Sequence, residues 1–178
     1  MSKDLLFKLV VSESGKEKYT ANLSYEAVSN IVSSFADNAD SNDFFILAAQ
    51  HAASSVRENV AYKDNLSGEV VEILSKDSSI GVLRNLVRSS AFRENATQVE
   101  LERLIKLDTE IAQSIANNVD GFEQADTNKL AGLLATNEDP SVVASLAQNY
   151  SAPKKVLKTL VNHPDPYVAS EAKARLED

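Results

Sequence analysis

The sequence predicts an all-α solenoid of about five helix pairs and a C-terminal helix, preceded by a short N-terminal β-hairpin. Three observations predict this fold class. Two apolar patterns alternate along the chain, helix-starting residues lie at the joints between them, and the N-terminal residues follow neither pattern. We therefore expect two parts: a hairpin over residues 1–23 that caps the first helix, and a helical repeat domain over residues 24–178.

The hairpin is predicted by strand periodicity. Tyr19, Ala21 and Leu23 alternate with polar residues, and the segment SESGKE at 12–17 has the composition of a turn. An isolated two-stranded hairpin is marginally stable in water. We therefore expect it to pack on the helices or to pair with another strand, and self-association through these N-terminal strands is one expectation.

In the first apolar pattern, one apolar residue is followed by a second four positions later. A third usually follows five positions after the first. Its members start 28, 26, 29, 31 and 26 residues apart. They are Val28/Val32, Val56/Val60/Ala61, Val82/Leu86/Val87, Ile111/Ile115/Ala116, Val142/Leu146/Ala147 and Val168/Ala172. Because side chains three or four positions apart lie on one face of a helix, each member predicts one helix and its buried side.

The second pattern, apolar at i, i+3 and i+4, falls between successive members of the first. Its members are Phe44/Leu47/Ala48, Val70/Ile73/Leu74, Leu101/Leu104/Ile105, Leu130/Leu133/Leu134 and Leu157/Leu160/Val161. Each ends six to eight residues before the next first-pattern helix. This constant phase predicts a two-helix unit that repeats from about residue 24 to the end and buries its apolar face against its neighbours.

Helix-starting residues lie where the patterns begin. Capping boxes are predicted at Thr97/Glu100 and Ser55/Glu58, and a cap residue precedes proline at Asp139-Pro140 and Asp165-Pro166. Further cap candidates are Ser24, Ser41 and Ser151. Gly132 lies inside a predicted helix, where glycine costs about 1 kcal/mol relative to alanine. We expect it to allow another helix to approach closely.

Two segments carry a resemblance to a known repeat family. They are VRENVAYKDNLSGEVVEILSKDSSIGVLRNLVRS, which starts at Val56, and VVASLAQNYSAPKKVLKTLVNHPDPYV, which starts at Val142. Both resemble leucine-rich repeat variant units, which are close to HEAT-like helical repeats. The resemblance covers residues 51–178 well and 24–50 weakly, and it implies a fold without implying an activity. The units here are longer than that family's usual unit, and the family's iron–sulfur module requires cysteine, which this chain lacks.

Composition narrows the function classes. The formal net charge is −8, aromatic residues make up 6% and tryptophan is absent, which disfavours nucleic acid as a partner. The absence of cysteine excludes disulfides and thiol catalysis. No apolar run has the length of a membrane span, and the N-terminal sequence does not resemble a signal peptide. We expect a cytoplasmic protein that does not bind membranes.

No residue set predicts a metal, a cofactor or a catalytic centre. His51 and His163 have no further ligands nearby and fit turn or surface positions. The acidic segment ADNADSND at 36–43 lacks the glycine and glutamate of a calcium loop, and we interpret it as a solvated turn before a helix cap. We therefore expect neither enzymatic activity nor a bound metal or cofactor.

Arg84, Arg88 and Arg93 are the candidate partner-binding residues. They lie in residues 79–106, where five basic residues stand against three acidic ones in an otherwise acidic chain. An arginine can bind a carboxylate or phosphate through two hydrogen bonds. The alternative is that they neutralise acids of neighbouring repeats, such as Asp77, and this remains open. Arg57 is expected to be structural and to pair with an acid of another repeat.

These observations favour a non-enzymatic protein-binding or scaffolding module, because solenoids present an extended concave surface built from successive repeats. Its exposed polar residues are expected on the second helix of each pair: Glu69, Glu72, Arg103, Lys129, Lys154 and Lys158. An enzyme-accessory or lyase-like HEAT-repeat protein is the alternative, and nucleic-acid binding is a weaker one.

Overall fold

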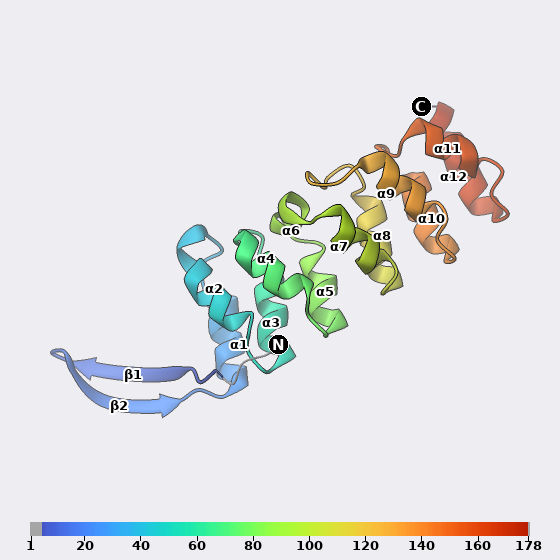
Figure 1. The fold of residues 1–178 in the computed structure, drawn as a ribbon. Coiled ribbons are helices and arrows are strands. Elements are labelled where there is room, and N and C mark those ends of the chain that lie inside the picture. The colour runs from blue at the N-terminus through green and yellow to red at the C-terminus, as the bar shows by residue number, and fades with distance from the viewer. Residues whose placement is uncertain (1–4, 178) are drawn as a thin grey trace. The chain divides into compact units, whose positions relative to one another are not determined.

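The structure is a computed structural model that describes residues 5–177. Over these residues it contains twelve α-helices and one two-stranded antiparallel sheet at the N-terminal end (Figure 1). The mostly helical prediction and the N-terminal hairpin are confirmed over this range. The chain forms two compact units, Met1–Ala91 and Phe92–Asp178, and each is described by itself.

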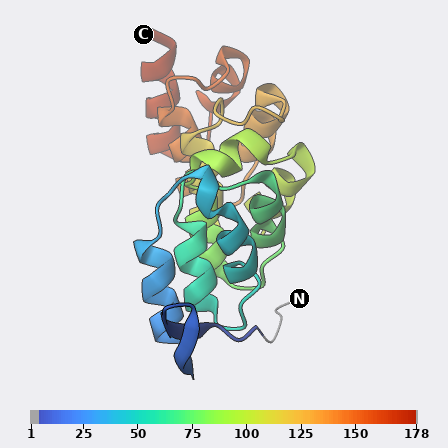
Figure 2. The ribbon, with the colours of Figure 1, turned by 90° about the vertical axis from the view of Figure 1, so that its left-hand side faces the viewer.

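The first unit places its helices in two layers. Its elements are β1 (Lys8–Glu13), β2 (Lys16–Asn22), α1 (Tyr25–Ser34), a 3-10 turn (Ala39–Ser41), α2 (Asn42–Ala48), α3 (Ser54–Ala61), α4 (Gly68–Ser75) and α5 (Ile80–Leu86). Helix α3 packs between α1 and α5, while α2 and α4 lie together against α3 and α5 (Figures 1 and 2). Helix α6 (Ser90–Asn95) follows at the boundary between the units.

The second unit repeats this arrangement. Its elements are α7 (Gln98–Ile105), α8 (Thr109–Asn117), α9 (Thr127–Leu134), α10 (Pro140–Gln148), α11 (Lys154–Leu160) and α12 (Pro166–Glu177). Helix α10 packs between α8 and α12 in one layer, while α9 contacts both α7 and α11 in the other (Figure 1). In each unit, the first helices of the predicted pairs therefore form one layer and the second helices form another.

The predicted core positions are largely confirmed. Every residue of the first apolar pattern is buried, and so are most residues of the second. Leu47 is the clear error, because its side chain is 48% exposed while Phe45 on the same helix is fully buried. Phe44 instead stacks on Phe35, with ring centroids 4.2 Å apart. Leu133 is only half-buried, whereas its neighbour Leu134 is fully buried.

Most predicted helix starts are confirmed. Thr97 and Glu100 form the capping box, and Asp139, Asp165 and Ser24 accept first-turn N–H groups through their side chains.

The remaining three cap predictions differ from the structure. The Ser55 prediction is wrong, because α3 begins one residue earlier, after Ala53, whose N–H is bound by the His51 side chain. The Ser151 prediction is wrong because α11 begins after Pro153. Ser41 precedes α2 but makes no capping hydrogen bond to it.

Gly132 does not mark a close helix approach. A Cβ atom built on it would meet no other atom within 4 Å, apart from its chain neighbours and the local helix backbone. The expectation from the sequence is therefore wrong, and the residue lies in open space on α9.

The hairpin pairs Lys8 with Asn22 and Glu13 with Lys16 at its two ends, around a turn formed by Ser14 and Gly15. Both turn residues have positive φ, 49° and 75°, as a type I′ turn requires. Every side chain of β1 is exposed, so the strand does not pack along a helix. Contact with the helices is made by Phe7, whose ring meets that of Phe44 edge-to-face at 5.9 Å. Residues 1–4 of the predicted 1–23 segment lie outside the described residues.

Among the helices of the described residues, none combines the length and the apolar character that are needed to cross a membrane.

Candidate functional site

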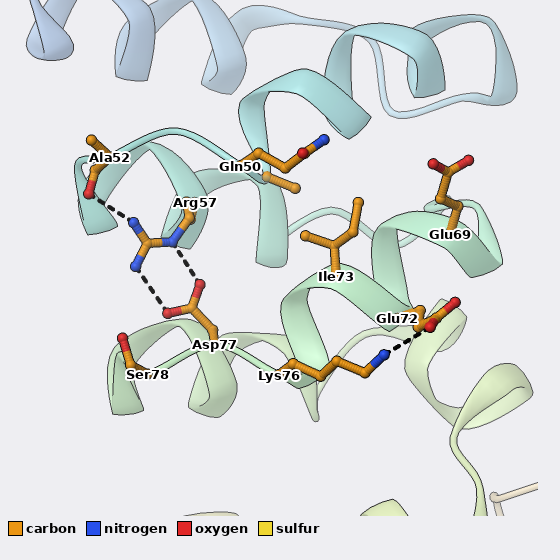
Figure 3. Close-up of a pocket in the computed structure, with 10 residues that line it drawn as sticks. Gln50, Ala52, Arg57, Glu69, Glu72, Ile73, Lys76, Asp77 and Ser78 are labelled. Carbon is orange, nitrogen blue, oxygen red and sulfur yellow. Dashed lines mark hydrogen bonds and ion pairs between the residues drawn. The ribbon is translucent and has the colours of Figure 1, made fainter. Parts of the chain in front are cut away.

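A pocket of about 660 Å³ lies beside α4 in the first unit (Figure 3). Helix α4 supplies Glu69, Glu72 and Ile73 because their positions face away from the buried Val70 and Leu74. The remaining lining comes from the end of α2, from α3 and from the turn after α4: Ala49, Gln50, Ala52, Arg57, Lys76, Asp77 and Ser78. One end of this pocket is a buried ion pair, and the other is a row of exposed carboxylates.

Arg57 and Asp77 form the buried ion pair. Arg57 donates from Nε to Asp77 Oδ2 at 2.6 Å and from Nη2 to Asp77 Oδ1 at 2.9 Å. Its Nη1 also donates to the carbonyl oxygen of His51 at 2.8 Å and to that of Ala52 at 2.9 Å, the second of which Figure 3 shows. The guanidinium therefore joins the turn after α2 to the turn after α4. The expectation that Arg57 is structural is confirmed, but its acidic partner Asp77 lies in the turn that ends its own repeat and not in another repeat.

The environment of Asp77 keeps it ionised. Burial is the largest single influence on its pKa and raises it, because a charged carboxylate is poorly solvated there. Hydrogen bonds from Arg57 and from the N–H of Ser79, together with the positive charge of Arg57, outweigh burial, and the pKa lies below its usual range. Arg57 correspondingly has a raised pKa, chiefly because of its hydrogen bond to Asp77.

The opposite end of the pocket is open and acidic. Glu69 and Glu72 are both exposed, and Lys76 Nζ lies 2.7 Å from Glu72 Oε1 (Figure 3). Lys76 is paired with Glu72 on the open side of the pocket, and Arg57 already donates from Nε, Nη1 and Nη2 to groups of the protein. Among the described residues, no cluster of three His, Cys, Asp or Glu side chains is arranged to hold a metal ion. The pocket therefore combines a buried ion pair with an open acidic side.

The two histidines are turn residues, as expected. His51 Nδ1 accepts the N–H of Ala53 at 3.0 Å, and His163 Nδ1 accepts the N–H of Asp165 at 3.1 Å. Asp77 and Asn137 accept the N–H two residues further on in the same way. Sequence reasoning missed this shared role, although His51 and Asp77, and again Asn137 and His163, are each 26 residues apart.

The acidic segment at 36–43 does more than form a solvated turn. The Asp37 carboxylate accepts the N–H groups of Asp64 and Asn65 at 2.9 and 2.8 Å. Asn42 Oδ1 accepts the N–H of Ser67, the residue that caps α4, at 2.8 Å. These side chains therefore position the loop between α3 and α4, which the sequence did not indicate.

Arg84, Arg88 and Arg93 do not belong to a single helix. Arg84 lies half-buried in the last turn of α5, whereas exposed Arg88 follows the end of that helix at Leu86. Although Arg84 and Arg88 are four residues apart, they therefore do not share one face of a helix. Arg93 is half-buried in α6, and its Cδ lies 3.2 Å from the position of a Cβ at Gly121. Each of the three is engaged in an interaction within the protein.

Basic side chains gather on the second-helix layer of the second unit. Helices α7, α9 and α11 and the cap of α7 carry six exposed basic residues: Arg103, Lys106, Lys129, Lys154, Lys155 and Lys158. The same helices and their caps carry three acidic residues, Glu100, Glu102 and Asp126, and Glu102 pairs with Lys129 at 2.7 Å. Sequence reasoning placed four of the basic residues on second helices but did not recognise that they form a basic face in an acidic chain.

Exposed apolar residues border this basic face on α7. Val99 is 76% exposed and Leu107 is 47% exposed. They line a shallow hollow of about 490 Å³ together with Glu102, Arg103 and Lys106. The face therefore offers both positive charge and apolar contact area.

Comparison with protein-family profiles, with curated proteins and with solved structures finds no match to this chain. Function is therefore inferred from the residues of this chain alone.

Proposed function

We propose that this protein is a non-enzymatic binding module, a HEAT-like or leucine-rich-repeat-variant solenoid, whose second helices bind an acidic segment of another protein. The observation that carries the proposal is the basic face of α7, α9 and α11. It displays six basic side chains beside three acidic ones, in a chain whose net charge is −8. Charge of one sign gathered on one face, against the sign of the whole chain, indicates a partner of opposite charge.

The geometry of α11 supports an extended acidic partner. Lys154 and Lys158 are one helical turn apart, and Lys155 is three residues from Lys158, so all three project from neighbouring positions of one exposed surface. Lys129 on the adjacent α9 and Arg103 on α7 continue the positive charge across the layer. A chain lying across these helices would meet a positive charge from each of them.

The hollow beside α7 favours a partner that also carries apolar side chains. Val99 and Leu107 are large exposed apolar residues next to Arg103 and Lys106. A partner segment that combines carboxylates with apolar side chains would cover them and gain about 25 cal/mol for each Å² of apolar surface buried. Binding of this kind needs shape and charge complementarity and no bond chemistry.

Arg84, Arg88 and Arg93 are proposed as subsidiary contact residues. Each already has an interaction within the protein, so engaging a partner would require exchange of an existing contact. The lysines of α11 are therefore the first residues to test.

The proposal is tested by charge reversal on α11. Lys154→Glu/Lys158→Glu is compared with Lys173→Glu, a charge reversal at an exposed position of α12, and partners captured from the source extract are identified by mass spectrometry. We expect wild type and Lys173→Glu to retain the same partner protein, and the double variant to lose about tenfold or more in affinity for the purified partner. Equal affinity of the double variant would overturn the proposal. Loss of capture after nuclease treatment would instead assign the face to nucleic acid.

A further inference from the structure

The outer edge of β1 is an exposed apolar strand. Leu9, Val10 and Val11 are 48%, 51% and 47% exposed, and every other β1 side chain is exposed as well. Over the described residues, the sheet consists of β1 and β2 only, so one side of β1 has no strand next to it. The hairpin extends away from the helices of its own unit, which leaves this edge accessible (Figure 1). An exposed edge of this kind is a template for adding a further strand.

The hydrogen-bonding pattern shows which backbone groups point outward. The N–H of Leu23 donates to the C=O of Phe7 at 2.8 Å. Hydrogen-bonded and non-hydrogen-bonded pairs alternate along an antiparallel ladder, so Leu9 and Val11 direct their backbone groups toward β2. The N–H and C=O groups of Lys8, Val10 and Ser12 therefore point to the outer edge.

We propose that two copies of this protein join through antiparallel pairing of their β1 strands, with Val10 opposite Val10 of the second copy. The inference is independent of the proposed function of the helical layer. In this register, Lys8 lies opposite Ser12 of the second copy, and both residues, like Val10, have outward backbone groups. The pairing forms one continuous four-stranded sheet around a twofold axis, as closed symmetric dimers require.

Side-chain matching favours this register over the two neighbouring twofold registers, which are centred on Val11 and on Leu9. Centring on Val10 places Leu9 opposite Val11 of the second copy, so apolar residues meet apolar residues. Centring on Val11 would place Leu9 opposite Glu13, and centring on Leu9 would place Val10 opposite Lys8. The two ends of β1 also carry opposite charges, Lys8 and Glu13, and an antiparallel neighbour brings each end next to the oppositely charged end of the other copy.

The apolar side chains on one face of the hairpin also favour a second copy of the chain as the partner. Leu9 and Val11 share one face with their cross-strand neighbours Ala21 and Tyr19, and Tyr19 is 58% exposed. Because the twofold axis is perpendicular to the sheet, it places this apolar face of both copies on the same side. A second copy therefore supplies both a complementary edge and a continuation of the apolar face.

The outer edge of β2 limits the assembly to two copies. A β-bulge interrupts the ladder between Val11 and Ser12, and it leaves Lys18 as an extra residue in β2. Lys18 pairs with Glu13 at 2.9 Å, and Glu17 accepts a hydrogen bond from Thr20. Bulges and charged residues protect an edge against further strand addition.

Single cysteines test the register, because the natural chain has none. In the proposed pairing, the two Cα atoms at position 10 are about 5.5 Å apart, within disulfide range. Those at position 11 are diagonal neighbours about 7–8 Å apart. Under mild oxidation, we expect Val10→Cys to form a disulfide-linked dimer at least about tenfold faster than Val11→Cys. Equal rates, or faster linkage at position 11, would overturn the register.

Proline at position 10 tests the association itself. Val10→Pro removes an outward N–H without removing a bond to β2, whereas Val10→Thr keeps that N–H and a β-branched side chain. By analytical ultracentrifugation, we expect wild type and Val10→Thr to dimerise as concentration rises, and Val10→Pro to remain monomeric. Amide exchange of β2 checks that the hairpin is retained. A wild type that stays monomeric up to about 1 mM, or a Val10→Pro variant that dimerises equally, would refute the proposal.

Discussion

Single residues join successive helix pairs through polar side chains that reach backbone groups. Arg57 binds two carbonyl oxygens and a carboxylate, and Asp37 binds two N–H groups of the loop between α3 and α4. A buried charge is costly unless it is fully hydrogen-bonded. The Arg57–Asp77 pair satisfies this condition, because its side chains are 9% and 6% exposed and both make several hydrogen bonds.

Asp77→Asn is expected to destabilise the protein by roughly 3 kcal/mol at pH 7, because it leaves the Arg57 charge buried without its counter-ion. The pKa of Asp77 is lowered on folding, so its stabilising contribution is present above the unfolded-state pKa of about 3.9 and is lost as the pH falls through the folded value. Urea denaturation between pH 7 and pH 3 would measure this loss, which should be smaller in Asp77→Asn. Arg57→Met/Asp77→Asn should recover part of the stability; fully additive losses would contradict a coupled pair.

Gly132→Ala is expected to raise the free energy of unfolding by about 0.5–1 kcal/mol. The added Cβ would enter open space, while the unfolded chain would lose conformational freedom. Gly132→Val is the matched control, because a β-branched side chain has a lower helix propensity and should stabilise less. Thermal and urea unfolding of both variants would measure the effect. Destabilisation by alanine would show that a neighbour approaches this position after all.

At the scale of elements, two neighbouring leucines of α9 differ in burial, because Leu134 lies in the core and Leu133 is only half-buried. We expect Leu134→Ala to cost about 2–5 kcal/mol because the side chain is fully buried. Leu133→Ala should cost distinctly less, since its side chain is half-buried. Leu160→Ala, at a 3% exposed position of α11, should resemble Leu134→Ala. Chemical denaturation measures all three, and equal costs for Leu133 and Leu134 would contradict the orientation of α9.

Helical periodicity was sufficient to predict the first helices, because their buried residues recur at four- and five-residue spacing on one face of each helix. It was insufficient for α2, which is only seven residues long and contains adjacent phenylalanines. There the period alone favours Leu47, while the stacking of Phe44 on Phe35 orients Phe45 into the core. In short helices with several large apolar residues, contacts with neighbouring helices therefore decide which side chains are buried. The sequence pattern does not contain those contacts.

The candidate site was predictable only in part, for a related reason. Charge and exposure of Lys129, Lys154 and Lys158 follow from their positions on second helices, which the repeat pattern provides. Whether these lysines form one basic face depends on which helices lie side by side in the fold. Arg57 was recognised as structural, but its two carbonyl partners lie in a turn whose path the sequence does not specify.

At the scale of the whole molecule, a basic face on an acidic chain makes binding sensitive to salt. The net charge of −8 would repel the proposed acidic partner at long range, while α11 would attract it at short range. The Debye length falls from about 10 Å at 0.1 M salt to about 3 Å at 1 M, so salt screens both effects. We expect affinity for the acidic partner to fall between these two concentrations, and the affinity of Lys154→Glu/Lys158→Glu to change less. Titration by calorimetry at several salt concentrations would measure both; a salt-independent affinity would contradict an electrostatic interface.

The turn acceptors have a consequence for how units of this fold diverge. His51, Asp77, Asn137 and His163 perform one task, which is to accept the N–H two residues further on. An imidazole, a carboxylate and an amide are interchangeable for that task, although residue-identity scoring treats them as unrelated. In this chain, what these turns share is therefore a hydrogen-bond acceptor near the backbone and not one amino acid. Units can therefore keep the same turn while sharing few identical residues, and the inheritance of this architecture is better traced through hydrogen-bonding capacity than through sequence identity.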